Sequence, residues 1–93
     1  MADWEYKDFR LSPDGETLAY INRQHGEDNV VVLNLIDMSL KAGFNSPDAN
    51  VVELSFLTND HLIVGVTDYR RTKVGRDQFI FNIKENKKIK LNW

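Results

Sequence analysis

The side chains that could carry chemistry in this sequence are few and scattered. The chain has two histidines, His25 and His61, and no cysteine, which excludes a thiolate nucleophile, a disulfide and a cysteine zinc site. A serine nucleophile of the hydrolase type stands in a G-x-S-x-G turn. None of the serines has the two glycines of this turn; they are Ser12, Ser39, Ser46 and Ser55. The sequence therefore predicts no acyl chemistry, and we expect this chain not to be an enzyme.

Four acidic residues near the first two predicted turns raise the question of calcium; they are Asp14, Glu16, Glu27 and Asp28. No loop of about 12 residues with alternating oxygen ligands surrounds them. A histidine metal site needs about three or four converging ligands, and two separate histidines do not supply them. We therefore expect the acids to be solvated turn and loop residues and the histidines to lie in exposed turns. The sequence predicts neither a metal nor a cofactor.

The densest charge lies in one loop of the second half, where a tyrosine is followed by four cations. Arginine and tyrosine side chains can together hold a phosphate and stack on a base, but the rest of the chain offers little basic surface for nucleic acid. We predict a solvated loop or one that docks a companion domain, with a carboxylate or peptide contact as the alternative. The residues of this predicted docking loop are Asp68, Tyr69, Arg70, Arg71, Lys73 and Arg76.

Short apolar runs between turn residues must position these side chains. Helical periodicity is almost absent, and the runs are rich in Val, Ile, Leu, Phe and Tyr, which predicts an all-β fold. The predicted strands are residues 6–11, 17–22, 30–35, 40–44, 51–57, 61–67, 78–83 and 88–91. The clearest turn is Ser12-Pro13-Asp14-Gly15, because proline presets φ and glycine accepts a positive φ. Asn59 and Asp60 mark the corresponding turn of the second half.

The two halves of the chain repeat the same order of strands and turns. Aligning residues 9–15 with residues 54–60 gives a period of about 45 residues, and periods of this length with four antiparallel strands are typical of propeller blades. Both odd and even positions of the most apolar runs are hydrophobic, so we expect both faces of these strands to be covered. The sequence predicts a single β module, residues 1–93, made of two four-stranded antiparallel blades, residues 6–50 and 51–93.

Two segments of the sequence resemble a known family. Phe-Arg-Leu-Ser-Pro-Asp-Gly-Glu-Thr-Leu-Ala-Tyr at 9–20, followed by Asn-Val-Val-Val-Leu-Asn-Leu at 29–35, resembles the first blade of the N-terminal propeller in prolyl oligopeptidase family serine peptidases. The acylaminoacyl peptidase and dipeptidyl aminopeptidase branches are the most similar. Residues 51–66 resemble a blade opening with a Trp-x-Asn-Asp turn, with Leu57 at the aromatic position. The resemblance implies a propeller that caps an α/β-hydrolase domain and restricts access to its triad.

Composition and charge narrow the function classes further. The 93 residues fit one small domain, and 42% hydrophobic with 28% charged residues describes a globular chain. Residues 1–50 are net acidic and residues 51–93 net basic, within a formal charge of -2. No apolar run approaches the ~20 residues of a membrane span, and the acidic start differs from a secretory signal. We expect a soluble chain without a signal peptide, with its compartment left open and without nucleic-acid or membrane partners.

Two roles follow from these expectations. The first is a non-catalytic propeller segment that resembles the access-gating domain of a prolyl oligopeptidase-like peptidase and is completed by further blades or the hydrolase domain of a parent chain. The second is a self-assembling propeller or a strand-exchanged oligomer of identical chains, acting as a structural or binding module. Both roles require a partner, because a propeller ring typically holds about 4–8 blades and open sheet edges invite pairing.

Overall fold

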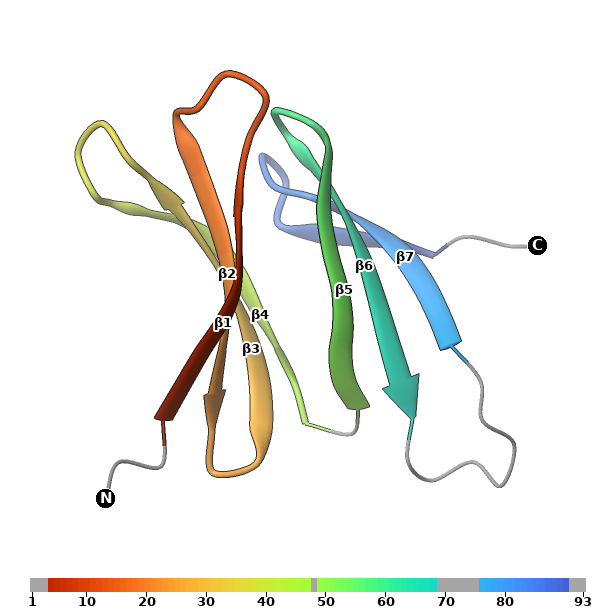
Figure 1. The fold of residues 1–93 in the computed structure, drawn as a ribbon. Coiled ribbons are helices and arrows are strands. Elements are labelled where there is room, and N and C mark those ends of the chain that lie inside the picture. Colours follow the sequence, from red (N-terminus) through yellow and green to blue (C-terminus); the bar gives the residue numbers. More distant parts are fainter. Residues whose placement is uncertain (1–3, 48, 69–75, 91–93) are drawn as a thin grey trace.

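The computed structural model describes residues 4–47, 49–68 and 76–90, which form strands and turns (Figure 1). This part of the chain contains no helix, and therefore none that could span a membrane. The eight strands are β1 (Trp4–Leu11), β2 (Thr17–Gln24), β3 (Glu27–Asn34), β4 (Leu40–Ser46), β5 (Ala49–Thr58), β6 (His61–Asp68), β7 (Arg76–Asn82) and β8 (Lys87–Lys90). The all-β prediction is confirmed.

The strands form two antiparallel four-stranded sheets, each in simple sequential order. We call β1–β4 the first sheet and β5–β8 the second sheet. Thr17 pairs with Asn34 in the first sheet, and His61 pairs with Asn82 at the same place in the second. The ladders close alike, because Leu35 N donates to Glu16 O at 2.9 Å and Ile83 N to Asp60 O at 2.8 Å. Thr17 and His61 are therefore equivalent positions of the two sheets.

The two sheets pack on each other and share one core. The buried apolar residues of the first sheet are Ala19, Ile21, Val30, Val32 and Ala42, and those of the second sheet and the turn after β7 are Val51, Leu54, Leu62, Val64, Phe81 and Ile83. The Phe44 ring joins them, with centroids 4.8 Å from Phe81 and 5.6 Å from Phe79. In Figure 1, β5 lies beside the first sheet, and it contacts all four strands of that sheet.

The predicted strands 17–22 and 30–35 are too short at the ends that face each other, since the polar residues 23–29 between them are mostly strand. Strand β2 continues to Gln24 and β3 begins at Glu27, which leaves only His25 and Gly26 between them. Both have positive φ, 53° and 77°, and two such residues match the twist of a tight hairpin. The polar sequence misled the prediction because polar side chains of paired strands can contact each other across the ladder.

Within the described part of the chain, only one face of each sheet is covered. Burial alternates along β2, where Ala19 and Ile21 are fully buried but Leu18 and Tyr20 are only partly buried. Two sheets present four faces, and their single interface covers only two of them. The described strands do not close into a ring, so the other two faces stay open.

Candidate interaction surface

The two turns singled out by the sequence lie next to each other. The first turn is the β1–β2 connection and holds Ser12, Pro13, Asp14 and Gly15. It is closed by a hydrogen bond from Gly15 N to Ser12 O at 2.9 Å, and Gly15 adopts φ 75°. Asp14 N donates to Asn59 Oδ1 at 3.0 Å. The structure thus joins the first turn of one sheet to the first turn of the other.

The carboxylates of these turns have structural contacts. Asp14 accepts hydrogen bonds from Ser12 Oγ at 2.5 Å and from Glu16 N at 3.0 Å, and the Ser12 bond is the main reason that the pKa of Asp14 lies below its ordinary value. Asp60 lies 3.6 Å from Lys84 Nζ at the surface. His61 Nδ1 is 2.8 Å from Thr58 Oγ1, whereas His25 is exposed in the β2–β3 turn. These contacts stabilise the turns.

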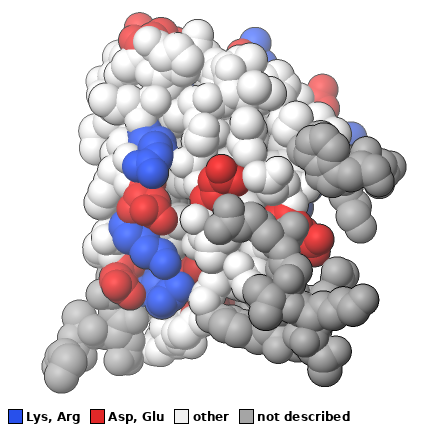
Figure 2. All heavy atoms as spheres, turned by 45° about the vertical axis from the view of Figure 1, so that its right-hand side comes forward, with Lys and Arg blue, Asp and Glu red and all other residues white. Residues whose placement is uncertain are grey.

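The predicted docking loop falls mostly outside the described residues. Tyr69, Arg70, Arg71 and Lys73 are not described, and Asp68 and Arg76 contribute only the backbone ends of β6 and β7. Elsewhere, Figure 2 shows acidic and basic side chains alternating along one band of the surface, with no large area of one sign among the described residues in that view.

A buried carboxylate joins the two sheets. Asp28 is 0% exposed, so the prediction that it is a solvated loop residue is wrong. Its Oδ1 accepts from Arg23 Nε at 2.7 Å, and its Oδ2 accepts from Arg23 Nη2 at 3.3 Å and from Val51 N at 2.8 Å. Arg23 also donates to Asn50 Oδ1 at 3.2 Å. The pair therefore fixes the start of β5 to the first sheet.

The surroundings of Asp28 keep it charged. Burial alone would raise its pKa, but the hydrogen bonds from Arg23 and Val51, together with the charges of Arg23 and Lys7, outweigh this effect and lower the pKa of Asp28 below its ordinary value. A second link has the same character, because Arg10 Nε donates to Leu54 O at 3.0 Å. Side chains of the first sheet thus satisfy backbone groups of the edge strand β5.

Sequence reasoning missed this link, although one signal was available. Arg23 and Asp28 stand at mirrored positions around the His25-Gly26 turn, and the ladder pairs them directly. Opposite charges at paired positions stabilise a hairpin. The contact with Val51 had no such signal, because it joins separate sheets.

The face of the first sheet that points away from the second sheet is apolar. We call it the first open face. Its apolar residues are Tyr6, Phe9, Leu11, Leu18, Tyr20, Val31, Leu33 and Leu40. Phe9, Leu11 and Leu40 are 53%, 59% and 68% exposed. The carboxylate of Glu27 lies at the end of this face, past the apolar cluster. A cluster of exposed apolar side chains with charge only at its margin is typical of an interface.

A bulge in β1 concentrates the aromatic residues on this face. The register shifts between Lys7 and Arg10, where Asp8 has φ 56°, and a bulge of this kind re-aims the residues that follow it. Phe9 therefore stacks on Tyr20 with ring centroids 5.3 Å apart, while Tyr6 lies 5.9 Å from the same ring. Three aromatic rings are thus gathered over β1 and β2.

A row of asparagines crosses one end of the first open face. Asn22, Asn29 and Asn45 are paired across β2, β3 and β4. Asn45 Nδ2 donates to Asn29 Oδ1 at 2.6 Å, and Asn29 Nδ2 donates to Asn22 O at 3.3 Å. Asn22 Oδ1 is buried and has no donor among the described residues. Asn45 Nδ2 also lies 3.4 Å from Glu27 Oε2, to which it donates, so the row of neutral amides ends beside a carboxylate and is only partly satisfied.

The open face of the second sheet, which points away from the first sheet, is more polar. This second open face carries Ile63, Ile80 and Ile89 in one row and Glu53 and Gln78 in the next. Gln78 Nε2 donates to Glu53 Oε1 at 2.6 Å. The Glu53 side chain lies over Gly65, where an added Cβ would come within 2.9 Å of Glu53 Cβ. A carboxylate therefore stands near the middle of this face.

Side chains at equivalent positions of the two sheets differ in burial. Counting along the ladders from Thr17 and His61, Leu18 corresponds to Leu62 and Tyr20 to Val64. Leu62 and Val64 are 0% exposed beneath the first sheet, whereas Leu18 and Tyr20 are only partly buried. The first sheet thus leaves open the face that the second sheet buries.

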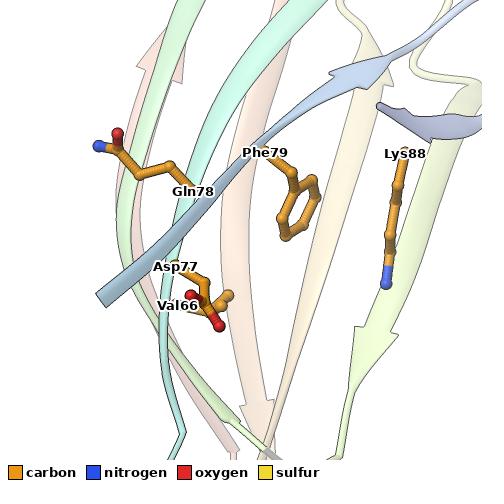
Figure 3. A pocket seen from close by; sticks show the side chains of 5 residues that line it. All are labelled: Val66, Asp77, Gln78, Phe79 and Lys88. Atoms are coloured by element: carbon orange, nitrogen blue, oxygen red, sulfur yellow. The ribbon is translucent and has the colours of Figure 1, made fainter. Parts of the chain in front are cut away.

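A small cavity lies beside β6, β7 and β8 of the second sheet. It measures about 240 Å³ and is lined by Val66, Asp77, Gln78, Phe79 and Lys88 (Figure 3). Lys88 Nζ lies 4.7 Å from the Phe44 ring centroid and 5.4 Å from that of Phe79, a cation–π arrangement. Ligand pockets usually exceed about 300 Å³, so the open face is the stronger candidate for binding.

The described residues contain no group of three or more acidic or histidine side chains that could hold a metal ion. Comparisons with protein-family models, curated proteins and solved structures found no match for this chain.

Proposed function

We propose that this chain is a non-catalytic β-sheet packing module that binds another β-sheet through the first open face. The observation that carries the proposal is the pairing of equivalent positions, in which Leu62 and Val64 are covered by a sheet and Leu18 and Tyr20 are not. Antiparallel sheets of this kind bury an apolar face at a spacing of about 10 Å. A second layer over the first open face would repeat the contact already made within the chain.

The two sheets have the strand order expected of neighbouring propeller blades, and the same orientation relative to each other. Equivalent residues of the two sheets face the same way, as they do in tandem blades, and this supports the propeller assignment. In the setting implied by the resemblance to prolyl oligopeptidase-like peptidases, the partner sheet is a further blade of a domain that restricts access to a hydrolase triad. The chain's role there is packing and docking, with the chemistry in a separate domain.

An apolar dye whose fluorescence rises on hydrophobic surfaces tests the proposal. At submicromolar protein concentration, the dye should bind the folded chain, and Val31→Lys should remove most of that binding, because it places a charge in the middle of the first open face. Ile80→Lys makes the same change on the second open face and serves as the matched control. Thermal unfolding confirms that both variants are folded.

Two results would contradict the proposal. One is the absence of dye binding to the wild-type chain at every concentration. The other is an equal loss of dye binding in Val31→Lys and Ile80→Lys, which would mean that the first open face is not the main dye-binding surface.

A further inference from the structure

We infer that the sheet bound by the first open face is the same face of a second copy of this chain, in a two-fold symmetric dimer whose axis runs along the strands. The inference rests on the proposed function, and it names the partner. Three features of the described residues support it: charge, hydrogen-bonding groups and shape.

Charge separates this arrangement from head-to-tail stacking. A head-to-tail stack would lay the second open face of one copy on the first open face of the next, and would bury the Glu53 carboxylate against an apolar face. Burying a carboxylate without a cation is unfavourable, and Glu53 is hydrogen-bonded to a neutral amide. The charged side chain of the first open face is Glu27, which is exposed at the end of β3 beyond the asparagine row and accepts from Asn45 Nδ2 at 3.4 Å. Glu27 pairs with Gln24 in the ladder, so the two-fold axis sets it over the partner's neutral Gln24 and not over a second carboxylate.

The asparagine row is self-complementary. A two-fold axis along the strands and between β2 and β3 preserves strand direction, so that β2 of one copy lies over β3 of the other. Asn22 then faces the partner's Asn29. Asn29 Nδ2 uses one hydrogen within the chain, and the amide group carries a second. Rotation of the Asn22 amide would bring Oδ1 to this donor, and the symmetry makes the contact twice.

The shape of the face fits the same symmetry. The aromatic rings of Tyr6, Phe9 and Tyr20 stand over β1 and β2, whereas the central pair of β3 and β4 is Val31 opposite Gly43, which has no side chain. The two-fold axis places β1 over β4 and β2 over β3. The bulky half of each copy therefore packs over the slender half of the other, which is the interlocking that a close sheet-on-sheet contact requires.

The size of the face predicts a weak, reversible dimer. Strands of about eight residues at ~3.3 Å per residue, four abreast at ~4.8 Å, cover on the order of 500 Å² per copy. The total of about 1,000 Å² is at the lower limit for a specific interface. We expect a dissociation constant in the micromolar range, so that both species are measurable in one concentration series.

Sedimentation velocity of the full chain from about 1 µM to 1 mM tests the inference. The wild type should pass from monomer to dimer, and its unfolding temperature should rise with concentration because dimerisation stabilises the folded state. Val31→Lys should weaken the dimer at least about tenfold, since each lysine is buried near the axis. Ile80→Lys should dimerise like the wild type. Leu33→Lys repeats the test on the same face.

Mixing two variants distinguishes a lost interface from a general loss of stability, because destabilised chains would not recover dimerisation when mixed. Tyr20→Glu and Val31→Lys should each be monomeric alone, but their mixture should dimerise, because the two-fold places position 20 of one copy beside position 31 of the other. A mixture of Tyr20→Glu with Ile80→Lys should contain no more dimer than the Ile80→Lys chain forms by itself.

The remaining outcomes separate the inference from the proposed function. A trimer or larger assembly that Ile80→Lys abolishes would indicate head-to-tail stacking, which overturns the inference and retains a packing function. A dimer unaffected by Val31→Lys, Leu33→Lys and Ile80→Lys would indicate strand exchange, and overturns it as well. A monomer at all concentrations that binds the apolar dye would overturn only the inference, whereas a monomer that binds no dye would overturn both.

Discussion

The first and second sheets share strand order, the register of their central ladder and turn closure, yet their outer faces differ. The first sheet presents three aromatic rings and a row of neutral amides, whereas the second presents isoleucines around a glutamate–glutamine pair. The central ladder is therefore common to both sheets, and under the proposed function the outward side chains decide which sheet accepts another layer. Shared topology does not imply shared function, because function depends on the surface that the fold displays.

The largest effect should come from the same substitution at two equivalent leucines. Leu62→Ala removes a fully buried side chain opposite Phe81 and should lower the free energy of unfolding by about 2–5 kcal/mol. Leu18→Ala removes the equivalent side chain opposite Leu33, on the partly exposed face. It should lower the free energy by about 1 kcal/mol at low protein concentration, because less apolar area leaves water there. Urea unfolding measures both.

The matched pair also tests the comparison itself. At high concentration, a covered first open face would make the Leu18→Ala effect approach that of Leu62→Ala. If the two substitutions cost the same amount at every concentration, the two faces would be equally buried and the contrast between the sheets would fail.

The second-largest effect concerns the buried pair that joins the sheets. Asp28→Asn removes the buried carboxylate that Arg23 contacts and should lower the free energy of unfolding by about 2–4 kcal/mol. The Arg23 side chain is 29% exposed and keeps Glu5 Oε2 at 3.9 Å, which favours the lower end. Because the folded state holds the Asp28 pKa below its ordinary 3.8, the contribution of the pair is complete above that pH and is lost as the pH falls through the folded pKa.

Unfolding measured between pH 7 and pH 2 checks both statements. Asp28→Asn should flatten part of the acid limb of the stability profile. Asp37→Asn is the control, since Asp37 is an exposed turn acid whose pKa is lowered mainly by the Ser39 hydroxyl, and its loss should have the smaller effect. An acid limb as steep in Asp28→Asn as in the wild type would show that the pair does not act in this way.

The elements of this fold were accessible from the sequence because their signals are local. Ser12-Pro13-Asp14-Gly15 and the apolar runs beside it identify a hairpin within a few residues. The inter-sheet links were not accessible in this way, since Asp28 reaches Val51 only after two sheets have formed and packed. The alternating burial of side chains along β2 could not be predicted from the sequence either, because an apolar face does not specify whether a partner covers it.

The smallest effect should come from Gly15, where the turns of the two sheets differ. Gly15 has φ 75° and nothing within 4 Å of an added Cβ, so Gly15→Ala adds backbone strain without a clash and should lower the free energy of unfolding by about 1 kcal/mol. Gly15→Asn should lower it by less, because asparagine tolerates a left-handed backbone. The turn of the second sheet has no such requirement, since neither Asn59 nor Asp60 has a positive φ, and Asp60→Gly should therefore give no stabilisation. Equal losses for Gly15→Ala and Gly15→Asn in urea unfolding would mean that a side chain, and not the backbone angle, is excluded at this position.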